Sequence, residues 1–187
     1  MMARWQPLLA EIQRVQSEIM WMAPHRDIGL APNPPASLTA IAAAEARIGR
    51  ALPPSYREFL LAHDGWPRFF EGASLLGTAN LGRRLYDDLV HAAFEAAETP
   101  VPDLGPVSLR PSPRRILIPF GVDLQATTLF AFNPTVALAD GEFEVIAWVN
   151  EIGIRRESFE SFLELMVELC VTERDARIAG DTSRSVG

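Results

Sequence analysis

Residues 52–66 constrain the fold of this chain more than any other stretch, because they specify both ends of a short helix. The pair Pro53–Pro54 suits the first helical turn, where the missing N–H of proline would have no partner in any case. Ser55 and Glu58 have the spacing of a capping box, and Gly65 can form a left-handed turn after the helix. One helical face carries Tyr56, Phe59, Leu60 and His63. The stretch therefore predicts a short core helix rather than a catalytic motif.

A longer helix is predicted near the N-terminus, over residues 3–22. Two series of residues spaced by seven form an apolar seam: Trp5, Ile12 and Ile19, and Leu8, Val15 and Met22. Three heptads are few for a coiled coil, and further apolar residues widen the stripe. We expect this helix to dock on the protein's own core, with a coiled-coil dimer as the alternative. The sequence alone does not assign an oligomeric state.

Proline and cap residues divide the next part of the chain. Four prolines in residues 23–36 predict an extended connector, and Ser37 is placed to cap a second helix that ends near Arg50. A further helix is predicted over residues 83–98. The stretch after it, up to Pro113, is too rich in proline for regular structure.

The second half of the chain predicts three strands, over residues 115–120, 127–132 and 142–149. A proline is expected to end the first strand or place it at a sheet edge, and Asn133–Pro134 to end the second. In the third strand, Phe143, Val145, Ala147 and Val149 are assigned to the core. The outward face then carries Glu142, Glu144, Ile146 and Trp148, which suits protein recognition. The alternative is that a second helix or loop covers the two apolar residues of this face.

The last predicted helix begins after Ser158, which is placed to cap it. Its buried stripe consists of Phe159, Phe162, Leu163, Met166 and Cys170. On nearly the opposite side, Glu160, Glu164 and Glu168 follow one another at four-residue spacing. Like charges at this spacing slightly destabilise a helix, which makes this stripe a candidate binding surface. The polar tail of residues 173–187 is expected to fray beyond its first residues.

The acidic residues are concentrated in one part of the chain. The protein carries 17 basic residues, all of them Arg, and 24 acidic ones, for a net charge of −7. Residues 140–173 contain nine acidic residues and two Arg, which accounts for the whole net charge. Such a segment repels phosphate backbones and attracts basic surfaces, which argues against nucleic-acid binding and for a basic protein partner. The alternative is a solvated acidic face that keeps the protein soluble.

Composition and motifs limit the location and the chemistry of the protein. The single Cys170 excludes an internal disulfide, the chain does not open with a signal-peptide pattern, and its apolar runs fall short of the ~20 residues of a membrane span. We therefore expect a cytoplasmic protein that does not enter membranes. The sequence has no metal-ligand spacing, phosphate-binding glycine loop or nucleophile elbow, so neither an enzyme nor a cofactor is predicted. A small hydrolase whose residues meet only in the fold is the alternative.

Several short motifs, taken in order, resemble the SUKH superfamily, also called the Smi/Knr family. The matching motifs are Ala-Glu-Ala-Arg-Ile-Gly at 44–49, Leu-Pro-Pro-Ser-Tyr-Arg-Glu-Phe-Leu at 52–60, Asp-Gly-Trp at 64–66, Ile-Pro-Phe-Gly-Val-Asp at 118–123, Phe-Asn-Pro at 132–134 and Ser-Phe-Glu-Ser-Phe-Leu at 158–163. The resemblance covers roughly residues 37–170. Its signature residues are structural, so no catalytic role transfers with them: Leu52, Pro53, Tyr56, Phe59, Leu60 and Gly65.

The resemblance implies an α+β fold in which helices pack on a mainly antiparallel sheet. Residues 37–172 would form this domain, with an insertion at about 83–114. Residues 1–22 would be an N-terminal helical extension and residues 23–36 a connector. For bacterial members the resemblance implies immunity proteins that bind and neutralise toxins, often nucleases, without catalysis.

The expected partner is a cognate toxin with a basic surface, bound in a stoichiometric complex. Its binding residues are predicted to be Glu142, Glu144, Ile146, Trp148, Glu151, Glu157, Glu160, Glu164 and Glu168. The alternative function is an adaptor of the same family. An adaptor would recruit a cellular protein through the apolar seam of residues 5–22 or through the proline-rich insertion.

Overall fold

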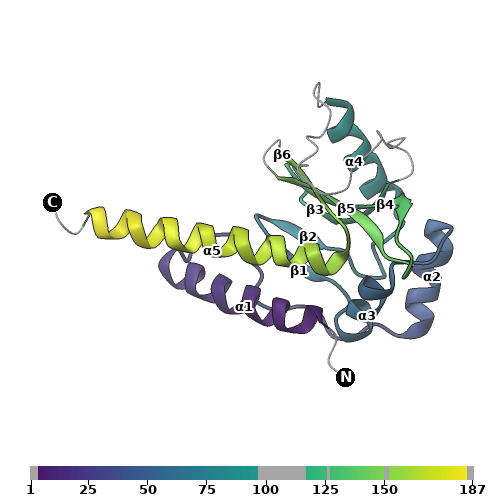
Figure 1. Cartoon of the computed structure of the whole chain (residues 1–187), viewed down its shortest axis with the longest axis horizontal. Helices are drawn as coiled ribbons and strands as arrows, with labels where there is room; N and C mark the ends of the chain where they lie inside the picture. Colours follow the sequence, from purple (N-terminus) through teal and green to yellow (C-terminus); the bar gives the residue numbers. More distant parts are fainter. Residues whose placement is uncertain (1–3, 97–116, 126, 150–151, 185–187) are drawn as a thin grey trace.

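The computed structural model describes residues 4–96, 117–125, 127–149 and 152–184. Within them the chain forms five helices and one antiparallel sheet of six strands, so the α+β fold predicted from the sequence is confirmed (Figure 1). The strands follow one another across the sheet in sequence order. The helices are α1 Trp5–Met22, α2 Leu38–Ile48, α3 Pro54–Ala62, α4 Arg84–Ala96 and α5 Phe159–Arg184. The strands are β1 Trp66–Phe70, β2 Ala73–Leu75, β3 Ile118–Val122, β4 Thr128–Ala137, β5 Phe143–Val149 and β6 Ile152–Arg156.

An aromatic cluster fills the space between the sheet and helices α3 and α5. Phe120 of β3 stacks on Phe132 of β4 with ring centroids 4.1 Å apart, and Tyr56 of α3 lies 5.0 Å from Phe159 of α5. The Tyr56 hydroxyl donates to the carbonyl of Leu76 at 2.7 Å, so this buried polar group is satisfied. Burial raises the pKa of Tyr56 well above its ordinary value. The signature stretch of the sequence is therefore the centre of the core.

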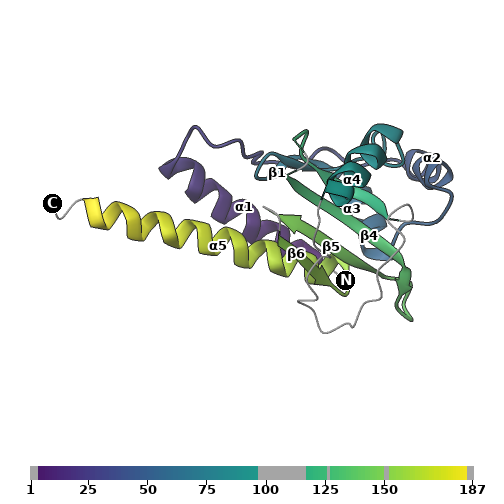
Figure 2. The same ribbon diagram turned by 90° about the horizontal axis from the view of Figure 1, so that it is seen from above.

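Helix α1 packs alongside α5, and both helices run in the same direction away from the sheet (Figures 1 and 2). The apolar seam faces the protein's own core: Trp5, Leu9, Ile12, Val15 and Ile19 are buried. Trp5 makes an edge-on contact with Phe59 of α3 at 6.0 Å. The prediction that this helix docks on its own chain is confirmed.

The connector and helix α4 complete the arrangement. The connector borders the edge strand β1, where the N–H of Gly29 donates to the carbonyl of Arg68 at 2.7 Å and the N–H of Asn33 to that of Gly65 at 2.9 Å. These bonds satisfy backbone groups that an edge strand would otherwise expose. Helix α4 lies against β3, on the other side of the sheet from α5 (Figure 1). Both faces of the central strands therefore have a neighbour.

Two predicted helix ends differ from the structure. The capping box of Ser55 and Glu58 is wrong, because α3 begins after Pro53 without a side-chain cap from either residue. Ser55 instead donates to Glu142, from its N–H and from its hydroxyl, at 2.7 Å each. The expectation of a frayed tail is also wrong, because α5 continues to Arg184.

Ion pairs with α1 and with the loop after it reach α5 as far as Arg174. Arg174 of α5 pairs with Glu18 of α1 at 3.3 Å, and Glu173 pairs with Arg26 at 2.8 Å. The polar composition of this stretch had suggested fraying, but its side chains find partners across the helix pair. These contacts support the part of α5 around Glu173 and Arg174, which carries few apolar residues.

The strand ends also differ from the sequence prediction. Strand β3 pairs on both sides, so its proline does not place it at an edge. On β3, the short β2 pairs only with Gly121 and Val122, which leaves Pro119 beyond that ladder and next to a register shift. Strand β4 continues through Asn133–Pro134 to Ala137, again with a register shift. In both strands the pairing is irregular next to the proline, so the strand continues past it.

Candidate functional site

The face of β5 that was predicted to point outward is buried. Glu144 is 1% exposed, Ile146 3%, and Glu142 and Trp148 8% each. The expectation of an exposed recognition face is therefore wrong, and the alternative that the face is covered agrees with the structure. Glu144, Ile146 and Trp148 are therefore closed to a partner in this arrangement, whereas Glu142 keeps a small exposed part that lines a concavity described below.

Glu144 has structural partners on the neighbouring strands. The side-chain amide of Asn133 on β4 donates to Glu144 at 2.7 Å, and the guanidinium of Arg155 on β6 lies 3.7 Å from it. All three residues are buried. A buried carboxylate that holds a cation and an amide stabilises the strand pairing rather than offering charge to solvent.

Several acidic residues of the segment 140–173 meet around one concavity of about 560 Å³. Five carboxylates line it: Asp140, Glu142, Glu157, Glu160 and Glu164. We call this space, with the residues that line it, the acidic concavity. Arg4, Ser55, Leu138, Ser158 and Ser161 complete the lining. The acidic concavity thus brings together four of the nine predicted binding residues.

The remaining acidic candidates lie elsewhere. Glu168 is exposed further along α5, outside the acidic concavity. Glu151 falls outside the described residues. Asp140 lines the site although it was not among the predicted binding residues, and Arg4 lines it from the N-terminal extension. The charge count of residues 140–173 could have indicated Asp140, whereas no local signal placed Arg4 near it.

Two turns shape the acidic concavity. The β4–β5 turn contains Gly141 at φ +86°, a conformation that favours glycine, and the N–H of Glu142 donates to Asp140 at 3.1 Å. At the start of α5, Ser158 and Ser161 bond reciprocally, since each N–H donates to the hydroxyl of the other residue. The predicted cap by Ser158 is therefore confirmed. These turns place carboxylates from the sheet and the helix around one space.

The electrostatics of the acidic concavity favour a cationic group. Five carboxylates face one guanidinium, that of Arg4, so the lining has an excess of negative charge. The N-terminus of α5 offsets part of this charge with its partial positive charge. Within the described ranges, no group of three or more His, Cys, Asp or Glu is arranged to hold a metal ion. The acidic concavity is suited to arginine or lysine side chains of a protein.

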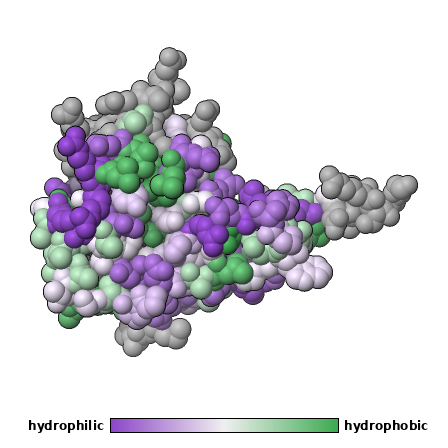
Figure 3. Space-filling view, turned by 180° about the vertical axis from the view of Figure 1, so that it is seen from behind, coloured by the Kyte–Doolittle hydropathy of each residue, from purple (hydrophilic) through white to green (hydrophobic). Residues whose placement is uncertain are grey.

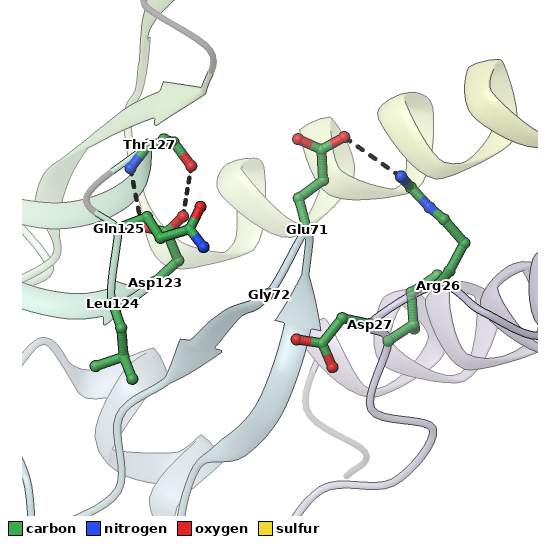
Figure 4. Close-up of a pocket in the computed structure, with 9 residues that line it drawn as sticks. Arg26, Asp27, Glu71, Gly72, Asp123, Leu124, Gln125 and Thr127 are labelled. Atoms are coloured by element: carbon green, nitrogen blue, oxygen red, sulfur yellow. Dashed lines mark hydrogen bonds and ion pairs between the residues drawn. The ribbon is translucent and has the colours of Figure 1, made fainter.

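A second concavity of about 550 Å³ lies where the loop after α1 meets the turns β1–β2 and β3–β4 (Figure 4). Its charged groups already have partners within the chain. Glu71 lies 3.6 Å from Arg26, and the carboxylate of Asp123 accepts from the N–H of Thr127 at 2.9 Å. Asp27 pairs with Arg68 at 3.1 Å. The two ion pairs join the loop after α1 to β1 and its turn, and the Asp123 bond closes the β3–β4 turn, which makes this concavity the weaker candidate for a partner.

Two further observations bear on the kind of site. Seen from behind, hydrophobic residues form separate patches among hydrophilic ones, so this face does not present one continuous apolar surface (Figure 3). Burial and the nearby Glu173 raise the pKa of Cys170 to about 12. At neutral pH this buried residue is a thiol, which agrees with a packing role and not with a nucleophile.

The fold and the site define a class of protein: an α+β module with a charged, open concavity suited to binding. The chain matches the SMI1 / KNR4 family (SUKH-1) over residues 35–168 and belongs to that family. The match confirms the resemblance drawn from the sequence motifs, and it leaves α1 outside the matched range. No curated protein matches the chain. None of the described helices has the length and apolar character to cross a membrane.

Proposed function

We propose that this protein is an immunity protein that neutralises a bacterial toxin, possessing a basic surface, by direct stoichiometric binding. The acidic concavity is the observation that carries the proposal, because it gathers carboxylates of the β4–β5 turn and of the start of α5 around one space. Membership of the SUKH family is consistent with this function. A toxin that acts on nucleic acid would have the required basic surface, since it must attract phosphate groups.

The proposed mechanism is electrostatic attraction followed by occupation of the acidic concavity. Glu157 and Glu164 are exposed and Glu160 is half-buried, so all three are available to a partner. Carboxylates can bind guanidinium groups bidentately, which adds geometric specificity to the attraction. Complementary charge raises association rates by ~10–10³ at low salt. A toxin bound in this way would have its basic surface covered.

The test begins with the gene next to the one for this chain, which should encode a toxin candidate, and then uses that protein, purified with its own activity measured. Changing Glu157, Glu160 and Glu164 together to Gln should weaken binding by roughly tenfold or more at low salt. The unchanged protein should itself lose affinity as salt rises from about 0.05 M to about 0.5 M. Titration calorimetry and the residual toxin activity provide the two measurements.

A matched control removes the same number of charges elsewhere. Asp27, Asp88 and Asp175 are exposed and lie outside the acidic concavity, so changing all three to Asn should leave affinity nearly unchanged. Asp27 also lines the second concavity, so this control tests that site too. Binding that is indifferent to salt, or equal losses in the two triple variants, would show that the acidic concavity is not the binding surface.

The structure weakens one route to the alternative adaptor function. The apolar seam of residues 5–22 packs on the protein's own core, so it is not free to recruit another protein. The other proposed route, the proline-rich part of the insertion, lies largely outside the described residues. The acidic concavity is therefore the surface on which the immunity proposal rests.

A further inference from the structure

We draw no further inference here: the strongest candidate, the largely apolar groove of about 760 Å³ between α1 and the proline-rich connector, has its floor residues Trp5, Leu9 and Trp66 buried, and nothing in the described structure shows what covers it.

Discussion

Two acidic regions of this protein, strand β5 and the start of helix α5, both carry glutamates among apolar residues but have opposite environments. On β5, Glu144 is enclosed between two other strands and bound to Asn133 and Arg155. On α5, Glu164 is exposed at the acidic concavity. Both were predicted to bind a partner on the strength of their charge. The difference teaches that a charge pattern identifies a binding surface only when the opposite face of the element, and what covers it, are also known.

The largest expected effect concerns the buried carboxylate. Glu144→Ala should lower the free energy of unfolding by about 3–5 kcal/mol, because it leaves the buried guanidinium of Arg155 without its counter-charge. Urea denaturation followed by circular dichroism measures this loss. The control is Glu164→Ala, which should change stability by less than about 0.5 kcal/mol. Equal losses in the two variants would remove the distinction between the regions.

A second contrast of the same kind compares two glycines with similar backbone angles, Gly65 at φ +84° and Gly49 at φ +79°. A Cβ on Gly65 would lie 2.6 Å from the carbonyl oxygen of Leu75, whereas a Cβ on Gly49 meets nothing within 4 Å. Gly49→Ala should therefore cost only the strain of the left-handed backbone, about 1–2 kcal/mol. Gly65→Ala should cost clearly more. Thermal unfolding of both variants measures the difference. A smaller loss of stability in Gly65→Ala than in Gly49→Ala would show that the close contacts around Gly65 do not determine the cost.

Glu142 lies between the two extremes, because it lines the acidic concavity and also binds the first turn of α3. Glu142→Ala should destabilise the protein by about 0.5–2 kcal/mol through loss of its two bonds to Ser55. Glu142→Gln should cost less, since the amide oxygen can still accept one of these bonds. Urea denaturation of the two variants ranks them. A Gln variant as unstable as the Ala variant would show that the charge, and not the acceptor, matters.

The smallest expected effects come from two exposed glutamates of α5, of which one lines the acidic concavity and the other does not. Glu168→Gln on the exposed side of α5 should leave stability within about 0.5 kcal/mol of the parent and leave toxin binding unchanged. Glu164→Gln should be equally neutral for stability but should weaken binding. Calorimetric titration of the two single variants tests this. Equal binding losses would extend the binding surface along α5 beyond the acidic concavity.

Local signals in the sequence predicted most of the helices and the core. Ser37 and Ser158 cap α2 and α5 through bonds that span three residues, so their spacing is visible in the sequence. The buried stripes of α1 and α5 follow from helical periodicity in the same way. The α+β class and the family then followed from the order of these elements and their motifs.

The errors arose where partners are distant in sequence. Ser55 and Glu142 are separated by 87 residues, so a capping box with the nearby Glu58 was the only cap that the sequence could suggest. Strands β1 and β2 are a local exception: their short hairpin went unpredicted, and it has positive φ angles at Arg68 and Glu71, which are uncommon for such residues. The acidic concavity likewise depends on Arg4 meeting a strand turn far along the chain. Contacts between residues so far apart form only when the sheet has assembled, so local sequence patterns do not reveal them.

The pairing of α1 with α5 has a consequence for how the protein is made. Among the described elements α1 comes first in the chain and α5 comes last, so α1 is synthesised well before its packing partner. Until then the apolar stripe of α1 around Ile12 and Ile19 has no permanent cover, and such exposed surface promotes aggregation. The packing of α1 on α5 therefore waits for the synthesis of α5, and a chain terminated before α5 would present this stripe to the cell's chaperones and proteases.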